Sequence, residues 1–134
     1  GLVGSEMCIR DSVGLADIGI EEQVEQWKLL GDFPGPRIIV DSDEMLANPT
    51  LAFSKICAAL ELPNIETMFH WEKGPKPYDG PWSPYWYAKV HDSSGFGLPS
   101  PLRETLTGRY LELEQQALPY YEELWQQRLR LNTF

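Results

Sequence analysis

The sequence contains 134 residues, of which 43% are hydrophobic and 23% charged, and this composition is typical of a soluble globular chain of at most one domain. Its formal net charge of −9 argues against a nucleic-acid partner, because such a partner requires a basic face. No apolar run approaches the roughly 18–20 residues of a membrane span, and two cysteines do not make a disulfide framework. We therefore expect a cytoplasmic protein without a membrane span.

The first twelve residues, GLVGSEMCIRDS, stand apart from the rest of the chain. Residues 7–12, MCIRDS, resemble the in-frame translation of an adapter used in sequencing libraries, and processing segments of this kind are excluded from fold reasoning. We expect residues 1–12 to be an adapter-derived artefact and residues 13–134 to be the native chain.

Asp17–Leu30 is predicted to form the first helix. Its apolar residues recur at near-helical spacing, at Ile20, Val24, Trp27 and Leu30. Acidic residues crowd its first turn, where the helix macrodipole favours them. An ordinary packing helix is the expectation here.

A strand, an acidic turn and a second helix are predicted next. Arg37–Val40 is a short β-branched apolar run that follows Pro-Gly-Pro, which predicts a buried strand near residues 37–41. Asp41-Ser42-Asp43 favours a turn. Asn48-Pro49 gives an N-cap residue followed by proline at the first helical position, and Leu62-Pro63 ends the helix. Together these elements form half of a βαβ unit.

Aromatic residues alternate with prolines and glycines between residues 64 and 97. This density of proline and glycine excludes a regular helix over Gly74–Pro84, whereas the aromatic residues argue against disorder. We expect an ordered loop held by its rings, followed by a short helical turn around Tyr85–Val90.

The C-terminal segment Ser100–Phe134 is predicted to be helical. Ser100-Pro101 repeats the signature of an N-cap followed by proline, and apolar residues continue at helical spacing. Pro119 lacks a backbone N–H group, so the helix is expected to kink or restart there.

The predicted strand, the acidic pair Asp43-Glu44, Leu46, Asn48-Pro49 and the following helix resemble the late strand–helix block of P-loop sulfotransferases. Glu61 stands where this family usually has glycine, at the end of the helix. The glycine-rich P-loop of the family occurs nowhere in the sequence, and Ile9-Arg10-Asp11 resembles its 3′-phosphate segment only at the wrong spacing. The resemblance therefore implies an α/β fold class: the C-terminal fragment of a three-layer P-loop fold, mostly helical as given, with one short strand.

The same family has a late loop whose basic residues and glycine wrap the 3′-phosphate of the sulfate donor. The segment from Lys73 to Trp82 resembles this loop, and glycine lets cations and backbone N–H groups approach a phosphate closely. The residues that this resemblance implies for donor binding are Lys73, Gly74, Lys76, Gly80 and Trp82. Ser93 and Ser94 are further candidates, which either donate to an anion or simply form a turn. The alternative is that both lysines are solvated and the loop only covers the core.

His91 is the candidate catalytic residue. A histidine beside this loop can act as a general base on an acceptor hydroxyl, because an imidazole titrates near neutral pH. The alternative is a partly exposed structural histidine. No metal site is expected, because His70 and Glu72 lack further ligands at metal spacing.

Two functions remain open from the sequence. In the first, the chain is part of a sulfotransferase-like enzyme that transfers a sulfuryl group from the nucleotide 3′-phosphoadenosine 5′-phosphosulfate to a hydroxyl or amine of a small-molecule acceptor. The fragment itself is then inactive, because the P-loop is absent. In the second, the aromatic and proline-rich loop over residues 69–96 is the partner-binding surface of a non-catalytic module, since Tyr and Trp concentrate at binding hot spots.

Overall fold

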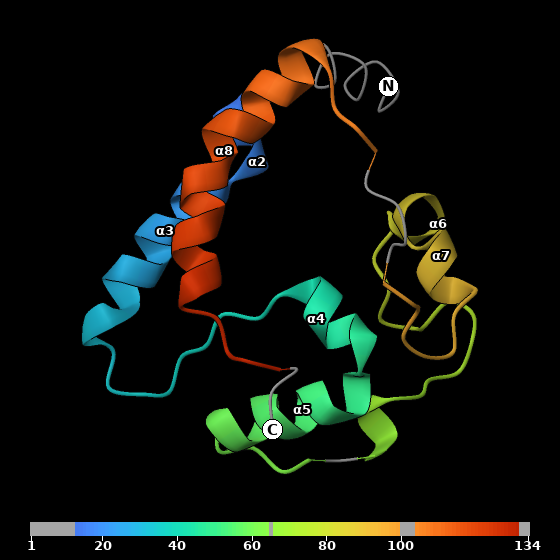
Figure 1. Ribbon diagram of the computed structural model, residues 1–134. Helices are drawn as coiled ribbons and strands as arrows, with labels where there is room; N and C mark the ends of the chain where they lie inside the picture. The colour runs from blue at the N-terminus through green and yellow to red at the C-terminus, as the bar shows by residue number, and fades with distance from the viewer. Residues whose placement is uncertain (1–12, 65, 100–103, 132–134) are drawn as a thin grey trace. The chain divides into compact units, whose positions relative to one another are not determined.

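The computed structural model describes residues 13–64, 66–99 and 104–131, and the predicted adapter segment 1–12 lies outside this range (Figure 1). The described residues are mostly helical and fall into two compact units. The first unit contains residues 13–39 and 104–128, and the second contains residues 40–64, 66–99 and 129–131.

The first unit begins with two short helices in place of the single helix predicted over Asp17–Leu30. Helix α2 covers Leu15–Ile18, α3 covers Ile20–Leu29, and a 3-10 turn, η1, covers Leu30–Asp32. Gly19 separates α2 from α3 and has a φ of 72°, in the left-handed region that glycine enters without steric cost. The prediction of one continuous helix was therefore wrong at its first turn.

The long helix α8, Gly108–Gln126, packs along α3 (Figure 1). Val24 of α3 and Leu113 and Leu124 of α8 are buried. The charge of Glu21 is the main cause that raises the pKa of the Tyr120 hydroxyl, which donates to it, and burial adds to the effect. Polar contacts between α3 and the segment from Tyr120 to Gln127 include Trp27 Nε1 with Gln127 Oε1 (2.8 Å), Lys28 Nζ with Glu123 Oε1 (3.2 Å) and the Tyr120 hydroxyl with Glu21 Oε1 (3.3 Å).

Helix α8 corrects two predictions for the C-terminal segment. Residues 104–107 and 127–131 are not helical, so the helix is shorter than Ser100–Phe134, and the predicted start at Ser100-Pro101 lies outside the described residues. The helix also continues through Pro119, so the restart expected there as an alternative to a kink does not occur. A proline costs a helix interior about 3 kcal/mol. The burial of Leu113 and Leu124, on either side of Pro119, opposes this cost.

The second unit contains two linked helices whose starts agree with the sequence signals. Helix α4 covers Ser42–Ala47 and α5 covers Pro49–Ala59. The Asp41 side chain accepts the N–H of Glu44 at 2.9 Å and caps α4. Asn48 caps α5 by accepting the N–H of Leu51 at 3.2 Å, with Pro49 in the first turn as predicted.

No strand forms at Arg37–Val40, so the predicted half βαβ unit is incomplete. A strand requires a neighbour that pairs with its backbone N–H and C=O groups, and no segment of the described residues pairs with this one. The Arg37 guanidinium instead donates to the carbonyl of Trp27, in the last turn of α3, and lies 4.1 Å from the centroid of the Trp27 ring. This cation satisfies a helix carbonyl that lacks an intrahelical donor.

The aromatic loop is ordered and is held by its rings, as predicted. Phe53 of α5 packs against Phe69, with ring centroids 5.6 Å apart, and against Phe96 at 5.2 Å. Trp71 meets Phe96 edge to face at 5.4 Å. The predicted helical turn near Tyr85–Val90 is present as two short helices. The short elements of this loop are η2 (Glu66–Met68), α6 (Ser83–Trp86) and α7 (Ala88–His91).

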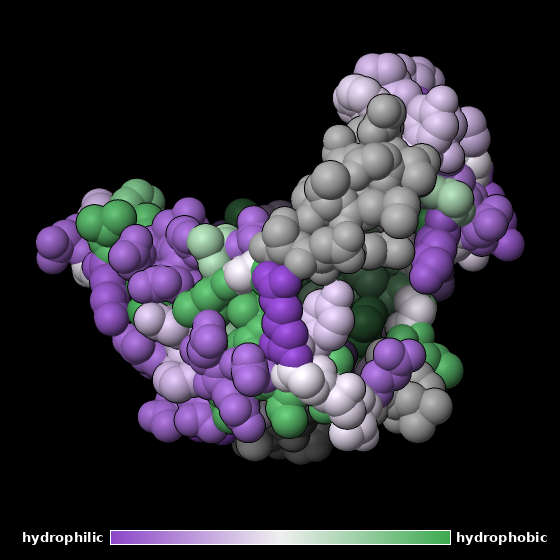
Figure 2. Space-filling model, turned by 90° about the horizontal axis from the view of Figure 1, so that it is seen from above, coloured by the Kyte–Doolittle hydropathy of each residue, from purple (hydrophilic) through white to green (hydrophobic). Residues whose placement is uncertain are grey.

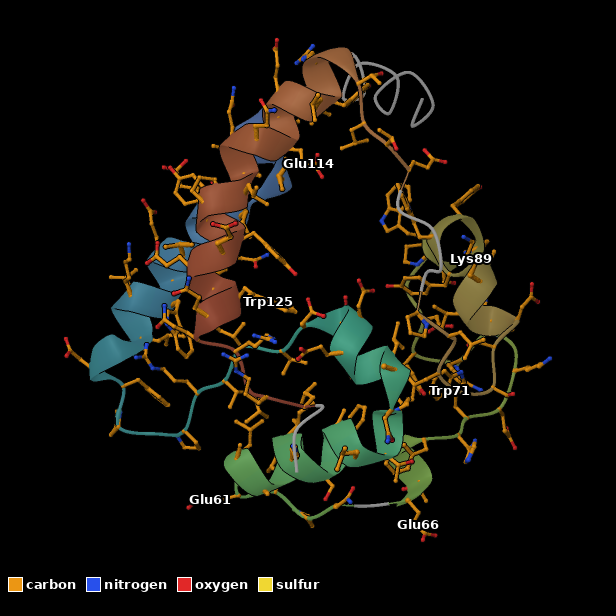
Figure 3. The ribbon with its side chains drawn as sticks, in the orientation of Figure 1. Glu61, Glu66, Trp71, Lys89, Glu114 and Trp125 are labelled. Carbon is orange, nitrogen blue, oxygen red and sulfur yellow. The ribbon has the colours of Figure 1, made fainter. Side chains whose placement is uncertain are left out.

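Helix α5 ends in a left-handed residue that is not glycine. Glu61, labelled in Figure 3, has a φ of 58°. The N–H of Leu62 donates to the carbonyl of Cys57 at 2.8 Å, and the N–H of Glu61 donates to the carbonyl of Ala58 at 3.3 Å. These two bonds define a Schellman motif, in which glycine is the usual residue at the position of Glu61.

Glu61→Gly is expected to raise the free energy of unfolding by about 1 kcal/mol, because the left-handed conformation costs an L-residue roughly 1–2 kcal/mol and costs glycine nothing. Urea denaturation followed by circular dichroism measures this change. Glu61→Ala is the control, since it removes the charge but keeps the Cβ atom. Equal stabilisation by both variants would assign the effect to charge and contradict the strain at this position.

Candidate functional site

Two backbone segments of the second unit meet next to α7 and form a pocket. His70 and Gly95 form an antiparallel bridge, and the N–H of Trp71 donates to the carbonyl of Ser94 at 3.1 Å. Further along, the N–H of Gly74 donates to the carbonyl of His91 at 2.7 Å. These contacts bring the loop over residues 71–80 against the last turn of α7.

The side chains of His91 and Asp79 are in hydrogen-bond contact at this junction. The Nε2 atom of His91 lies 2.9 Å from Oδ2 of Asp79, and the two side chains are 17% and 15% exposed. The carbonyl of His91 is also bonded to Gly74, so both the ring and the backbone of this residue hold the loop. A carboxylate on one ring nitrogen fixes the orientation of an imidazole.

Lys76 holds Asp79 from the other side. Its N–H donates to Oδ2 of Asp79 at 2.7 Å, and its ammonium group donates to the carbonyl of Glu72 at 2.7 Å. The hydrogen bond from the Lys76 N–H is the main cause that lowers the pKa of Asp79 below its ordinary value of 3.8. The hydrogen bond and charge of His91 and the charge of Lys76 lower it further, against the opposing effect of burial.

The pocket beside His91 and Asp79 has a volume of about 300 Å³, at the lower end of the range for small-molecule sites. Its wall combines two aromatic rings with charged groups of both signs. The lining residues are Trp71, Glu72, Gly74, Lys76, Asp79, Tyr87, Val90 and His91.

Three of the residues predicted from the sequence come together in this pocket: Gly74, Lys76 and His91. Gly74 has a φ of 96°, and a Cβ atom at this position would meet no other atom within 4 Å. Glycine is therefore required here by the backbone conformation and leaves the loop open to an approaching group. Its own N–H is already used by His91.

The other predicted residues lie outside the pocket lining. Lys73 and Gly80 are exposed, and the Trp82 side chain is 56% exposed. The Ser93 hydroxyl accepts the ring N–H of Trp71 at 3.0 Å and donates to the carbonyl of Val90 at 2.7 Å, so its donor is used within the unit. Ser94 is exposed.

Asp79 is the residue that sequence reasoning missed. The sequence placed it in a loop expected to bind phosphate, where a carboxylate has no evident role, and twelve residues separate it from His91. The anchoring ring expected at Trp82 is provided by Trp71, labelled in Figure 3, which packs on Phe96 and bonds to Ser93. Neither long-range contact has a local sequence signal.

The described part of the chain lacks two features that would bear on its function. No helix in it combines the length and the apolar character needed to cross a bilayer. In the same residues, no three His, Cys, Asp or Glu side chains lie together in a way that could hold a metal ion.

The described groups can orient an imidazole and can attract an anion. Asp79 fixes His91 in the way that carboxylates fix general bases. Lys76 contributes a positive charge and a backbone N–H, which are donors that proteins use for phosphate and sulfate oxygens.

Comparisons with known proteins point to one family. A family model described as a sulfotransferase domain matches residues 2–128. Two proteins of Arabidopsis thaliana are similar: branched-chain-amino-acid aminotransferase-like protein 2, 35% identical over 108 residues, and branched-chain-amino-acid aminotransferase-like protein 1, 33% identical over 108 residues. Both matches cover 81% of this chain but only 19% and 20% of the relatives, so the chain spans about a fifth of their length. No solved structure matches.

Asp79→Asn is expected to flatten the loss of stability in acid. Because the folded Asp79 carboxyl has a pKa below its ordinary value of 3.8, the unfolded state binds more protons as the pH falls, and the wild-type chain loses stability between about pH 5 and pH 2. The variant lacks this titration. Urea midpoints over this range measure the difference. Asp92→Asn, at an exposed position outside the pocket lining, should follow the wild-type curve. Identical curves for all three chains would contradict the role of Asp79.

Proposed function

The chain belongs to the sulfotransferase domain family, and we propose that it is the C-terminal part of a P-loop sulfotransferase that uses 3′-phosphoadenosine 5′-phosphosulfate as its donor. The observation that carries this proposal is the family match over residues 2–128. The acceptor is a small molecule with a hydroxyl or amine group. The helical units described above are then part of a larger three-layer α/β fold.

The loop over residues 73–82 would contact the donor in this proposal. Its donor set suits an anion: Lys73 is exposed and makes no hydrogen bond or ion pair among the described residues, and Lys76 lines the pocket. Gly74 leaves space where a side chain would block the approach. The carboxylate of Asp79 opposes an anion at the same place, so this loop alone gives weak binding.

His91 is the residue that we assign to proton transfer. In sulfuryl transfer, the acceptor oxygen or nitrogen bonds to sulfur, the bond from sulfur to the donor phosphate breaks, and the acceptor loses its proton to a base. An imidazole held by a carboxylate suits this task. The close approach of Asp79 to His91, at 2.9 Å, supports the assignment.

The isolated chain is proposed to have no transfer activity. Sulfuryl transfer requires a glycine-rich strand-to-helix turn that holds the 5′-phosphosulfate, and the sequence contains no such motif. The names of the two Arabidopsis thaliana relatives refer to aminotransferase-like proteins about five times longer than the matched segment. Those names do not identify the function of this segment.

Exposed aromatic side chains support a second candidate function, a non-catalytic interaction module. Figure 2 shows hydrophobic side chains that reach the surface among hydrophilic ones. Large exposed side chains cluster in sequence around α6, and this surface would bind a partner through its rings. The members of the cluster are Tyr78 (84% exposed), Trp82 (56%), Tyr85 (73%), Trp86 (57%) and Tyr87 (45%).

Calorimetry with adenosine 3′,5′-bisphosphate separates the two functions. A sulfotransferase part is expected to bind this nucleotide weakly and in a salt-sensitive manner, and Lys73→Ala/Lys76→Ala should weaken the binding by about tenfold or more. Lys89→Ala is the matched control, since Lys89 is an exposed lysine of α7 outside the pocket lining. A radiolabelled transfer assay should give no product above the blank.

Two results would contradict the proposal. Indifference of the wild-type chain to the nucleotide would favour the interaction module. Transfer of sulfate by the 134-residue chain would refute its inactivity and require another donor cradle.

A further inference from the structure

The Asp79 carboxylate lies at a position suited to an oxyanion. A single oxygen, Oδ2, accepts the N–H of Lys76 at 2.7 Å and lies 2.9 Å from Nε2 of His91. Backbone N–H groups and imidazole or ammonium cations are the donors with which proteins hold phosphate and sulfate oxygens. The chain therefore builds an oxyanion position and fills it with its own carboxylate.

Lys76 adds positive charge to this position without forming an ion pair among the described residues. Its ammonium group donates to a neutral carbonyl, that of Glu72, at 2.7 Å. The Lys76 N–H is the main cause of the lowered pKa of Asp79, and the charges of His91 and Lys76 act in the same direction. The surrounding groups thus favour a negative charge at Oδ2, whichever molecule supplies it.

The structure leaves room for an exchange of occupants. The pocket of about 300 Å³ includes Lys76, Asp79 and His91 in its lining. The Asp79 side chain lines this pocket and is 15% exposed, so an anion in the pocket can reach the carboxylate and its partners.

We propose that the Asp79 carboxylate is a displaceable internal occupant of an oxyanion site, and that a phosphate or sulfate group enters by replacing it on the Lys76 N–H and the His91 imidazole. If this anion is a phosphate of the donor nucleotide, that assignment rests on the proposed function. The displacement of Asp79 by an anion does not depend on it. Each incoming anion must compete with the tethered carboxylate, which lowers the apparent affinity of the site. In the anion-bound state an oxygen of the anion takes the place of Oδ2 beside Nε2 of His91, so the anion then orients the imidazole as Asp79 does in its absence.

Asp79→Asn tests the displacement in the full 134-residue chain. The amide keeps an oxygen that can accept the Lys76 N–H but removes the competing negative charge. Inorganic phosphate is the probe, titrated at constant ionic strength and followed by NMR at the Lys76 amide. The variant is expected to bind phosphate about tenfold more tightly than the wild-type chain, because a like charge at contact distance is removed.

Asp92→Asn is the matched control, since it removes the same charge one residue after His91 but outside the pocket lining. Its phosphate affinity should equal that of the wild-type chain. Equal or weaker phosphate binding by Asp79→Asn, or no binding by either chain at millimolar phosphate, would overturn the proposal. Equal gains in Asp79→Asn and Asp92→Asn would overturn it as well, because they would reflect net charge alone.

A measurement on the wild-type chain decides the matter even if Asp79→Asn does not fold. The carboxyl carbon resonance of Asp79 should shift together with the Lys76 amide as phosphate is added. A shift of the amide with no response of the carboxyl would show that phosphate binds without displacing Asp79, and the proposal would fail.

Adenosine 3′,5′-bisphosphate and adenosine 5′-monophosphate distinguish this inference from the proposed function. If Asp79→Asn tightens phosphate binding but neither nucleotide binds better than phosphate, the displacement of Asp79 by an anion is supported and the assignment of that anion to the donor nucleotide fails. If the bisphosphate binds selectively but Asp79→Asn does not raise the affinity for phosphate, the donor assignment is supported and the displacement of Asp79 is refuted.

Discussion

The packing of Phe53 against two distant rings is the constraint on which the second unit depends. Phe53 lies on α5, which has its own caps, and it contacts Phe69 and Phe96 near the two ends of the aromatic loop. Aromatic pairs of this kind contribute about 0.5–1.5 kcal/mol each beyond their buried area. The short bridge between His70 and Gly95 would not hold such a loop alone, since an isolated bridge has few hydrogen bonds. The rings thus fix the register that brings residue 74 to His91.

The pocket presents hydrogen-bond donors for an anion, although the chain as a whole is negatively charged. A net charge of −9 repels anions at long range, so any anion that binds must be held by local donors. The donors near Asp79 are one backbone N–H, one imidazole and one ammonium group. Local hydrogen-bond geometry, more than the average charge of the surface, therefore sets which molecules the pocket accepts.

Local signals in the sequence were sufficient for some features and insufficient for others. The start of α5 followed from Asn48-Pro49, because capping depends on residues three positions apart. The strand at Arg37–Val40 did not form, because pairing depends on a partner that local sequence does not specify. Gly74, Lys76 and His91, which line the pocket, were singled out from residue type and position, and their roles stay predictions. Asp79 was missed, because its contact with His91 depends on how the rings close the loop.

Pro119 leaves one backbone carbonyl of α8 without its helical hydrogen bond. A proline has no N–H group, so the carbonyl of Gln115, four residues earlier, lacks its usual helical donor. Gln115 and Pro119 are both exposed, so water can supply the missing hydrogen bond. A dry partner that covered this side of the helix would leave that carbonyl unsatisfied, at a cost of about 1–3 kcal/mol. Pro119 therefore favours assemblies in which this side of α8 stays in contact with water, and it disfavours tight apolar packing against that side.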